Sequence, residues 1–219
     1  MHRRGPYVPQ CAYPEGERHA DFVTRIESRA RVLSRELAAA GVTAFTDATV
    51  RNGPAEVALF AKLAGSGAIC QRTAVMVGAP HLGSLNEVAE SARAGRIRIA
   101  ALKFMPGHDD ESMARRTRIA LEAGLDCAYH VTEVEELELA LESIELARRQ
   151  FASDVPLPNC RIEHGGTIPP DHIERIAATG SWVAVRGWLL RHRITGESFL
   201  EQVREYTPGT DENQQRRSL

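Results

Sequence analysis

Three residues in this sequence could do metal chemistry, because each stands at the end of a short run that is typical of a β-strand. Lys103 ends the run 98–103, His130 ends the run 126–130, and His164 follows the run 160–163. The carboxyl ends of parallel strands meet at one edge of a sheet, where (β/α)8-barrel enzymes place their chemistry. Imidazole nitrogens are zinc ligands. His130 and His164 are therefore candidate metal ligands.

Lys103 needs a modification to join them, because an ammonium group has no lone pair. As a carbamate it would present two oxygens and a negative charge, able to bridge two cations. A buried strand end can lower the pKa of an amine enough for this chemistry. The alternative for any lone histidine or lysine is a solvated or hydrogen-bonded loop residue. We adopt that alternative for four other histidines: His81, His108, His172 and His192.

The elements that must position these residues follow from hydrophobic periodicity, which predicts alternating helices and strands. Strands are expected at 42–46, 72–77, 97–104, 125–129, 160–163 and 182–185. A spacing of about 20–35 residues is that of a βα unit, and such units form a parallel sheet covered by helices. The predicted fold class is α/β, an incomplete (β/α)8 barrel of about six parallel strands. A full barrel has eight.

Local signals predict where the intervening helices begin and end. Thr132-Glu133-Val134-Glu135 fits a capping box, in which Thr132 and Glu135 satisfy amides at the start of a long helix. Three glycines are expected to end helices, and one of them, Gly41, suits the left-handed residue that follows a helix end. They are Gly41, Gly95 and Gly124.

Composition bounds the class of protein. The chain has 219 residues, 43% hydrophobic and 26% charged, with a net charge of −2. We divide it into an irregular segment 1–18, one partial barrel domain 19–206 and a polar tail 207–219. The interspersed charges predict no nucleic-acid partner, and the short apolar runs predict no membrane span. Cys127 and Cys160 are expected to be buried reduced thiols of a cytoplasmic protein.

These segments resemble the metal-dependent amidohydrolase superfamily, in particular its amidohydrolase 3 type branch. The similar segments are 41–48, 102–105, 129–133 and, above all, Arg161-Ile162-Glu163-His164. The resemblance implies a barrel that binds one or two divalent metals, usually zinc, whose hydroxide attacks an amide, ring-amide or amidine carbon. It implies a ligand on the fourth strand at Lys103, which can be carboxylated, one on the fifth at His130 and one on the sixth at His164.

The sequence also departs from the family pattern. Relatives carry a His-x-His pair on the first strand and an aspartate on the eighth; no His-x-His occurs here, and no aspartate follows a late apolar run. We therefore expect the middle of an amidohydrolase, without the first and last barrel strands. No catalytic base is assigned, and we expect impaired hydrolysis. Asp47 and Arg186 end expected strands and could face a small-molecule substrate; a loop salt bridge explains each equally well.

Two hypotheses follow, and whether the chain is an enzyme stays open between them. In the first it is a metal-dependent hydrolase of carbon–nitrogen bonds other than peptide bonds. In the second it is an inactive remnant that serves as a binding or oligomerisation module, or as one piece of a split enzyme. Under either hypothesis, sheet edges at the strands ending on Asp47 and Arg186 predict self-association.

Overall fold

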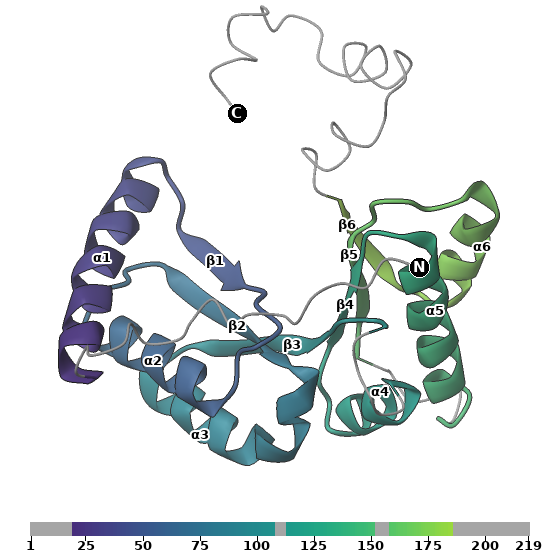
Figure 1. Cartoon of the computed structure of the whole chain (residues 1–219), viewed down its shortest axis with the longest axis horizontal. Coiled ribbons are helices and arrows are strands. Elements are labelled where there is room, and N and C mark those ends of the chain that lie inside the picture. The colour runs from purple at the N-terminus through teal and green to yellow at the C-terminus, as the bar shows by residue number, and fades with distance from the viewer. Residues whose placement is uncertain (1–18, 108–112, 152–157, 186–219) are drawn as a thin grey trace, which may run out of the picture. The chain divides into compact units, whose positions relative to one another are not determined.

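The computed structural model describes residues 19–107, 113–151 and 158–185, and Figure 1 shows its elements. The strands are β1 (Ala44–Asp47), β2 (Arg72–Gly78), β3 (Arg98–Phe104), β4 (Cys127–Val131), β5 (Cys160–His164) and β6 (Trp182–Val185). The helices are α1 (His19–Ala39), α2 (Pro54–Gly65), α3 (Leu85–Gly95), α4 (Met113–Glu122), α5 (Val134–Arg148) and α6 (Pro170–Ala178). A short 3₁₀ helix, η1 (Ala79–Ser84), follows β2.

The six strands form one sheet in the order of the chain, β1-β2-β3-β4-β5-β6. The pairs β1–β2, β2–β3 and β5–β6 are parallel, and a register shift interrupts β2–β3 between Val75 and Met76. Parallel strands that alternate with helices confirm the predicted α/β class, an incomplete (β/α)8 barrel. The predicted segments 1–18 and 207–219 lie outside the described residues.

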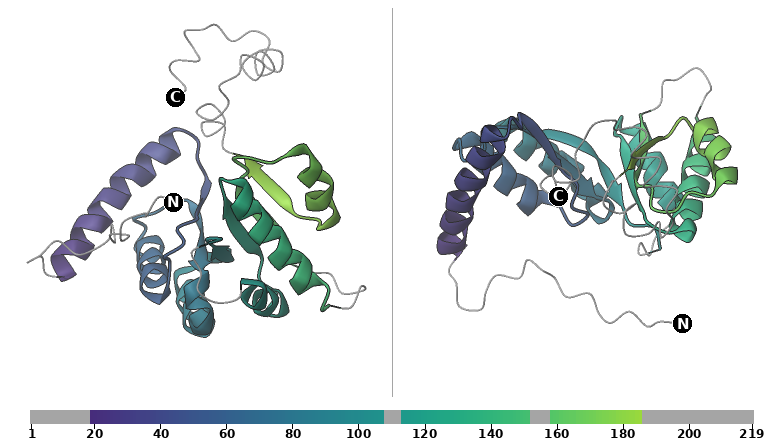
Figure 2. Two further views of the ribbon diagram at one scale, coloured as in Figure 1. Left: turned by 45° about the vertical axis from the view of Figure 1, so that its right-hand side comes forward. Right: turned by 90° about the horizontal axis from the view of Figure 1, so that it is seen from above.

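The chain divides into two compact units, Met1–Phe104 with Arg118–Cys127, and Met105–Thr117 with Ala128–Leu219. The first unit contains β1 to β3. Its core cluster of Leu63, Ala68 and Ile69 packs against α1 and against Phe45 of β1. Helices α2 and α3 lie side by side, as both views in Figure 2 show.

A glycine allows this close approach of α3 to α2. A Cβ atom built on Gly95 would lie 2.3 Å from the Cα of Ala61, a separation that real Cβ atoms do not reach. The helix does end at Gly95, as predicted, and Arg96 takes the left-handed conformation after it, with φ of 56°. Gly41 has the predicted left-handed φ, of 79°, and Gly124, which also follows a helix end, has φ of 74°.

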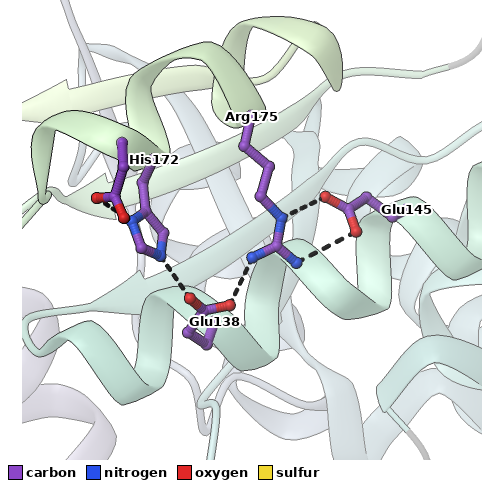
Figure 3. A network of polar contacts seen from close by, with 5 residues as sticks. Glu138, Glu145, His172 and Arg175 are labelled. Atoms are coloured by element: carbon purple, nitrogen blue, oxygen red, sulfur yellow. Dashed lines mark hydrogen bonds and ion pairs between the residues drawn. The ribbon is translucent and has the colours of Figure 1, made fainter.

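The second unit is built on α5, whose buried stripe includes Leu137, Leu141 and Ile144. Polar contacts join α6 to α5 on the outside of this stripe. Figure 3 shows them: Glu138 accepts hydrogen bonds from both His172 and Arg175, and Arg175 also donates to Glu145. His172 lies within helix α6 and is buried, so the interpretation of it as a loop residue is wrong.

Two further predictions concern thiols and membranes. Cys127 and Cys160 are buried free thiols, as expected. Among the helices of the described residues, none has the length and apolar character that crossing a membrane requires.

Candidate functional site

The structure brings His130 and His164 into contact. The Nε2 atom of His164 lies 3.0 Å from the Nδ1 atom of His130, a hydrogen-bonding distance in which the tautomers decide which ring donates. The ring centroids are 4.5 Å apart, and the ring planes meet at 77°, edge to face. Both side chains are half-buried. Two strands thus present two imidazoles whose nearest nitrogens converge.

Two polar contacts hold the strand that carries His130, one at its middle and one just beyond its carboxyl end. Tyr129 is fully buried, and its hydroxyl lies 2.7 Å from the hydroxyl of Thr117 in α4. Because side chains alternate along a strand, His130 points away from that contact. The strand end after His130 is fixed by Glu136, whose Oε2 accepts hydrogen bonds from the amide and the hydroxyl of Thr132 at 2.6 and 2.9 Å.

Glu136 also corrects the predicted start of α5. Its Oε2 accepts a hydrogen bond from the amide of Glu133, and the helix begins at Val134, so the capping carboxylate is Glu136 and not Glu135. Burial alone would raise the pKa of Glu136. The hydrogen bonds from Thr132 and Glu133 outweigh that effect and, with the nearby His130, hold the pKa below its usual value. An ionised carboxylate therefore holds the loop that follows His130.

His164 is positioned by an unusual backbone. Its φ is 77°, in the left-handed region that costs an ordinary side chain about 1–2 kcal/mol. A turn at two glycines follows: Gly165 has φ of 55°, and the amide of Gly166 donates to the carbonyl of Val131 at 3.3 Å. A Cβ on Gly166 would lie 2.7 Å from the carbonyl oxygen of Thr132. The turn therefore packs tightly on the end of β4, beside His130.

Glu163 forms an ion pair with a neighbour on its own strand. Arg161 lies two residues before it on the same strand face, and its guanidinium forms an ion pair with Glu163 at 2.5 Å. Glu163 is also buried, so this ion pair compensates its charge inside the fold.

Lys103 belongs to the first compact unit, whereas His130 and His164 belong to the second. It lies in β3, opposite Gly78 of β2 in the strand register. Its side chain is only 3% exposed, which agrees with the buried strand end that a carbamate requires. Carboxylation of Lys103 stays a prediction.

Of the two expected substrate residues, only Asp47 is described. Its Oδ1 accepts hydrogen bonds from Asn52 Nδ2 at 2.7 Å and from the amide of Thr49 at 3.0 Å. Asn52 is buried and also donates to the carbonyl of Met76. Asp47 therefore shapes the loop after β1, through a buried asparagine that the sequence reasoning did not single out. Arg186 lies outside the described residues.

The histidine pair offers a metal two nitrogen donors. Within residues 19–107, 113–151 and 158–185, the structure shows no group of three or more His, Cys, Asp or Glu side chains that could hold an ion. Comparison of the chain with protein-family profiles, curated proteins and solved structures gives no match.

Proposed function

We propose that this chain is an amidohydrolase-type, metal-dependent hydrolase of carbon–nitrogen bonds other than peptide bonds. It would act on small molecules in the cytoplasm, with an activity impaired because no His-x-His pair occurs in the sequence. The observation that supports the proposal is the pair of imidazole nitrogens, 3.0 Å apart at the ends of β4 and β5. The resemblance to amidohydrolases in the same segments supports the identity of the metal site.

The spacing of the two nitrogens suits a shared metal ion. Zinc binds histidine nitrogens at about 2.0–2.1 Å in tetrahedral geometry, which places two such nitrogens roughly 3.3 Å apart. The two nitrogens are 3.0 Å apart here, so they would have to move apart only slightly to bind one zinc ion. The proton shared by His130 and His164 must leave when a metal binds, so metal affinity should fall at acidic pH.

The left-handed backbone of His164 gives independent support. A residue held in a sparsely populated conformation costs stability, and such residues cluster at functional sites. Glycine would fill this position without strain. A histidine here, with its ring directed at a second histidine, fits a residue retained for its side chain.

Three further residues of the expected site would bind the metal or the substrate. Lys103, as a carbamate, would be a further ligand, and Asp47 and Arg186 would contact the substrate. Bound zinc would supply a water whose pKa is about 7. The sequence has no His-x-His, and no residue is assigned as the general base, whose loss costs about 10²–10⁴-fold in rate. Weak hydrolysis is the expected result.

Metal content tests the proposal directly. The full chain should retain about one zinc per molecule after dialysis, measured by atomic emission. His130→Ala and His164→Ala should weaken zinc binding by about tenfold or more, with circular dichroism confirming the fold. His164→Gly removes the same ligand and relieves the left-handed backbone, so it separates ligand loss from misfolding. His81→Gln, a histidine in η1 of the other unit, is the control. Zinc content unchanged in all three site variants would contradict the proposal.

A second candidate is the inactive binding or oligomerisation module, or one piece of a split enzyme. The observation that favours it is the exposure of apolar side chains on β6, where Trp182 is 66% and Val185 is 55% exposed. Assays against cyclic and open-chain amides separate the two functions. Zinc-dependent turnover that His164→Ala abolishes supports the hydrolase, whereas zinc binding without turnover supports the inactive alternative.

A further inference from the structure

A basic groove lies at the amino ends of β1, β2 and β3, within the first compact unit. Its volume is about 590 Å³, and its lining includes the arginines Arg72, Arg96 and Arg98. Pockets that bind small molecules typically have volumes of about 300–1,000 Å³. Asp47 and Lys103 lie at the opposite, carboxyl ends of β1 and β3, so this groove is separate from the candidate metal site.

The strand register explains why two of the arginines share one face of the sheet. Ala44 pairs with Arg72, while Ala74 pairs with Thr46 on one side and with Arg98 on the other. Paired residues in neighbouring strands project to the same face, and so do residues two apart in one strand. These five side chains therefore lie on one face of the sheet.

The helices α1 and α2 cover the other face. Phe45, between Ala44 and Thr46, packs against the cluster of Leu63, Ala68 and Ile69 and against α1 residues. The arginine face is thus the one turned away from α1 and α2. The small side chains of Ala44 and Ala74 leave space between Arg72 and Arg98, and the groove occupies that space.

The charge of the groove is uncompensated. Its lining contains three arginines and no acidic residue. All three arginines are exposed, and none of them makes an ion pair with a carboxylate in the part of the chain that the structure describes. Like charges gathered around one groove repel one another, and a multivalent anion would relieve that repulsion.

We propose that this groove binds a small phosphorylated molecule. Guanidinium groups present planar forks of N–H donors that match phosphate oxygens with two parallel hydrogen bonds, which a lysine cannot reproduce. Three of them around a space of about 590 Å³ suit a diphosphate or a sugar phosphate better than a single chloride ion. The net charge of the chain is −2, which favours a small anion over a long nucleic acid.

The test measures binding of inorganic pyrophosphate to the full chain by titration calorimetry at low salt. Saturable one-to-one binding is expected, with an affinity that falls as salt rises. Arg72→Ala and Arg98→Ala should each weaken binding by about tenfold or more, and Arg98→Lys should weaken it as well, because it keeps the charge but loses the fork. Arg93→Ala is the matched control, since Arg93 is an exposed arginine of α3 that does not line the groove.

Three results would overturn the proposal. One is the absence of saturable binding to the wild-type chain. Another is an equal loss in Arg93→Ala and Arg98→Ala, which would indicate a general charge effect. The third is tighter binding of a single-stranded oligonucleotide than of pyrophosphate, which would assign the groove to nucleic acid. Circular dichroism of each variant establishes that it is folded. Because the metal site shares no residue with the groove, His164→Ala should leave pyrophosphate binding unchanged, and zinc binding should survive Arg98→Ala.

Discussion

At the scale of single residues, two glycines at equivalent places in neighbouring helices have opposite surroundings. Gly95 is the last residue of α3, and a Cβ there would lie 2.3 Å from the backbone of Ala61 in α2. Gly65 is the last residue of α2, and a Cβ there would meet nothing within 4 Å. Neither glycine has a positive φ. The difference between them is therefore one of space.

Substituting each glycine by alanine measures that difference. We expect Gly95→Ala to lower the free energy of unfolding by about 1–3 kcal/mol, because the helices must move apart to admit the methyl group. Gly65→Ala should be neutral or raise it by about 0.4–1 kcal/mol, since alanine restricts the unfolded chain. Urea unfolding of both variants gives the two values. Equal effects of the two substitutions would show that α2 and α3 do not pack as closely as described.

The residue scale is also where the sequence was least informative. Gly95 ends its helix as expected, but its close packing on Ala61 had no signal in the sequence. Glu135 was chosen as the capping partner, whereas the carboxylate that binds the Thr132 amide is that of Glu136. Which residue caps a helix, or packs against its neighbour, changes with a shift of a single position. The periodicity of hydrophobic residues does not locate a helix end that finely.

At the scale of elements, the alternation of helices and strands was predictable from the sequence. Buried strands such as β2 form continuous apolar runs between turn signals, and amphipathic helices repeat every three to four residues. The contact of His130 with His164 also follows from adjacent strand ends. The polar contacts between α5 and α6 had no such signal, because Glu138 and His172 are 34 residues apart and look like ordinary surface positions.

Those contacts predict a pH-dependent attachment of α6. His172 lies between two carboxylates, with Nδ1 3.0 Å from Asp171 and Nε2 2.5 Å from Glu138, whose other oxygen accepts from Arg175. The hydrogen bonds to Asp171 and then Glu138 raise the pKa of His172. The hydrogen bond from His172 lowers the pKa of Glu138, and the hydrogen bond from Arg175 lowers it further. Glu145, the remaining charged group of the network, is occupied by Arg175.

The sign of the effect follows from these directions. The raised pKa means that protonated His172 stabilises the fold fully below its unfolded pKa of about 6.5, and that this contribution is lost as the pH rises through the folded value. We therefore expect the free energy of unfolding to fall as the pH rises above about 6.5. His172→Gln should flatten this decline in urea titrations at several pH values. His81→Gln, without such carboxylate contacts in the described chain, should retain it. A decline that persists in His172→Gln would assign it to another group.

At the scale of the whole molecule, the sheet has two outer strands. In the described strand order, β1 has only β2 beside it, and β6 has only β5. A strand with one unoccupied edge presents amide and carbonyl groups to a further strand. On β6 the side chains add to this tendency, because Trp182, Val183 and Val185 are exposed apolar residues. These features support the self-association that the sequence predicted for open sheet edges.

We expect the full chain to associate as its concentration rises, and β6 to carry much of the interaction. Trp182→Lys should weaken association by about tenfold or more, because a large aromatic side chain at the centre of an interface contributes most to binding. Ile173→Lys is the matched control: Ile173 in α6 of the same unit is 59% exposed against 66% for Trp182, but it belongs to a helix and not to an outer strand. Sedimentation velocity over a range of concentrations measures both variants. A monomer that persists at every concentration would refute association, and an equal effect of the two lysines would move the interface away from β6.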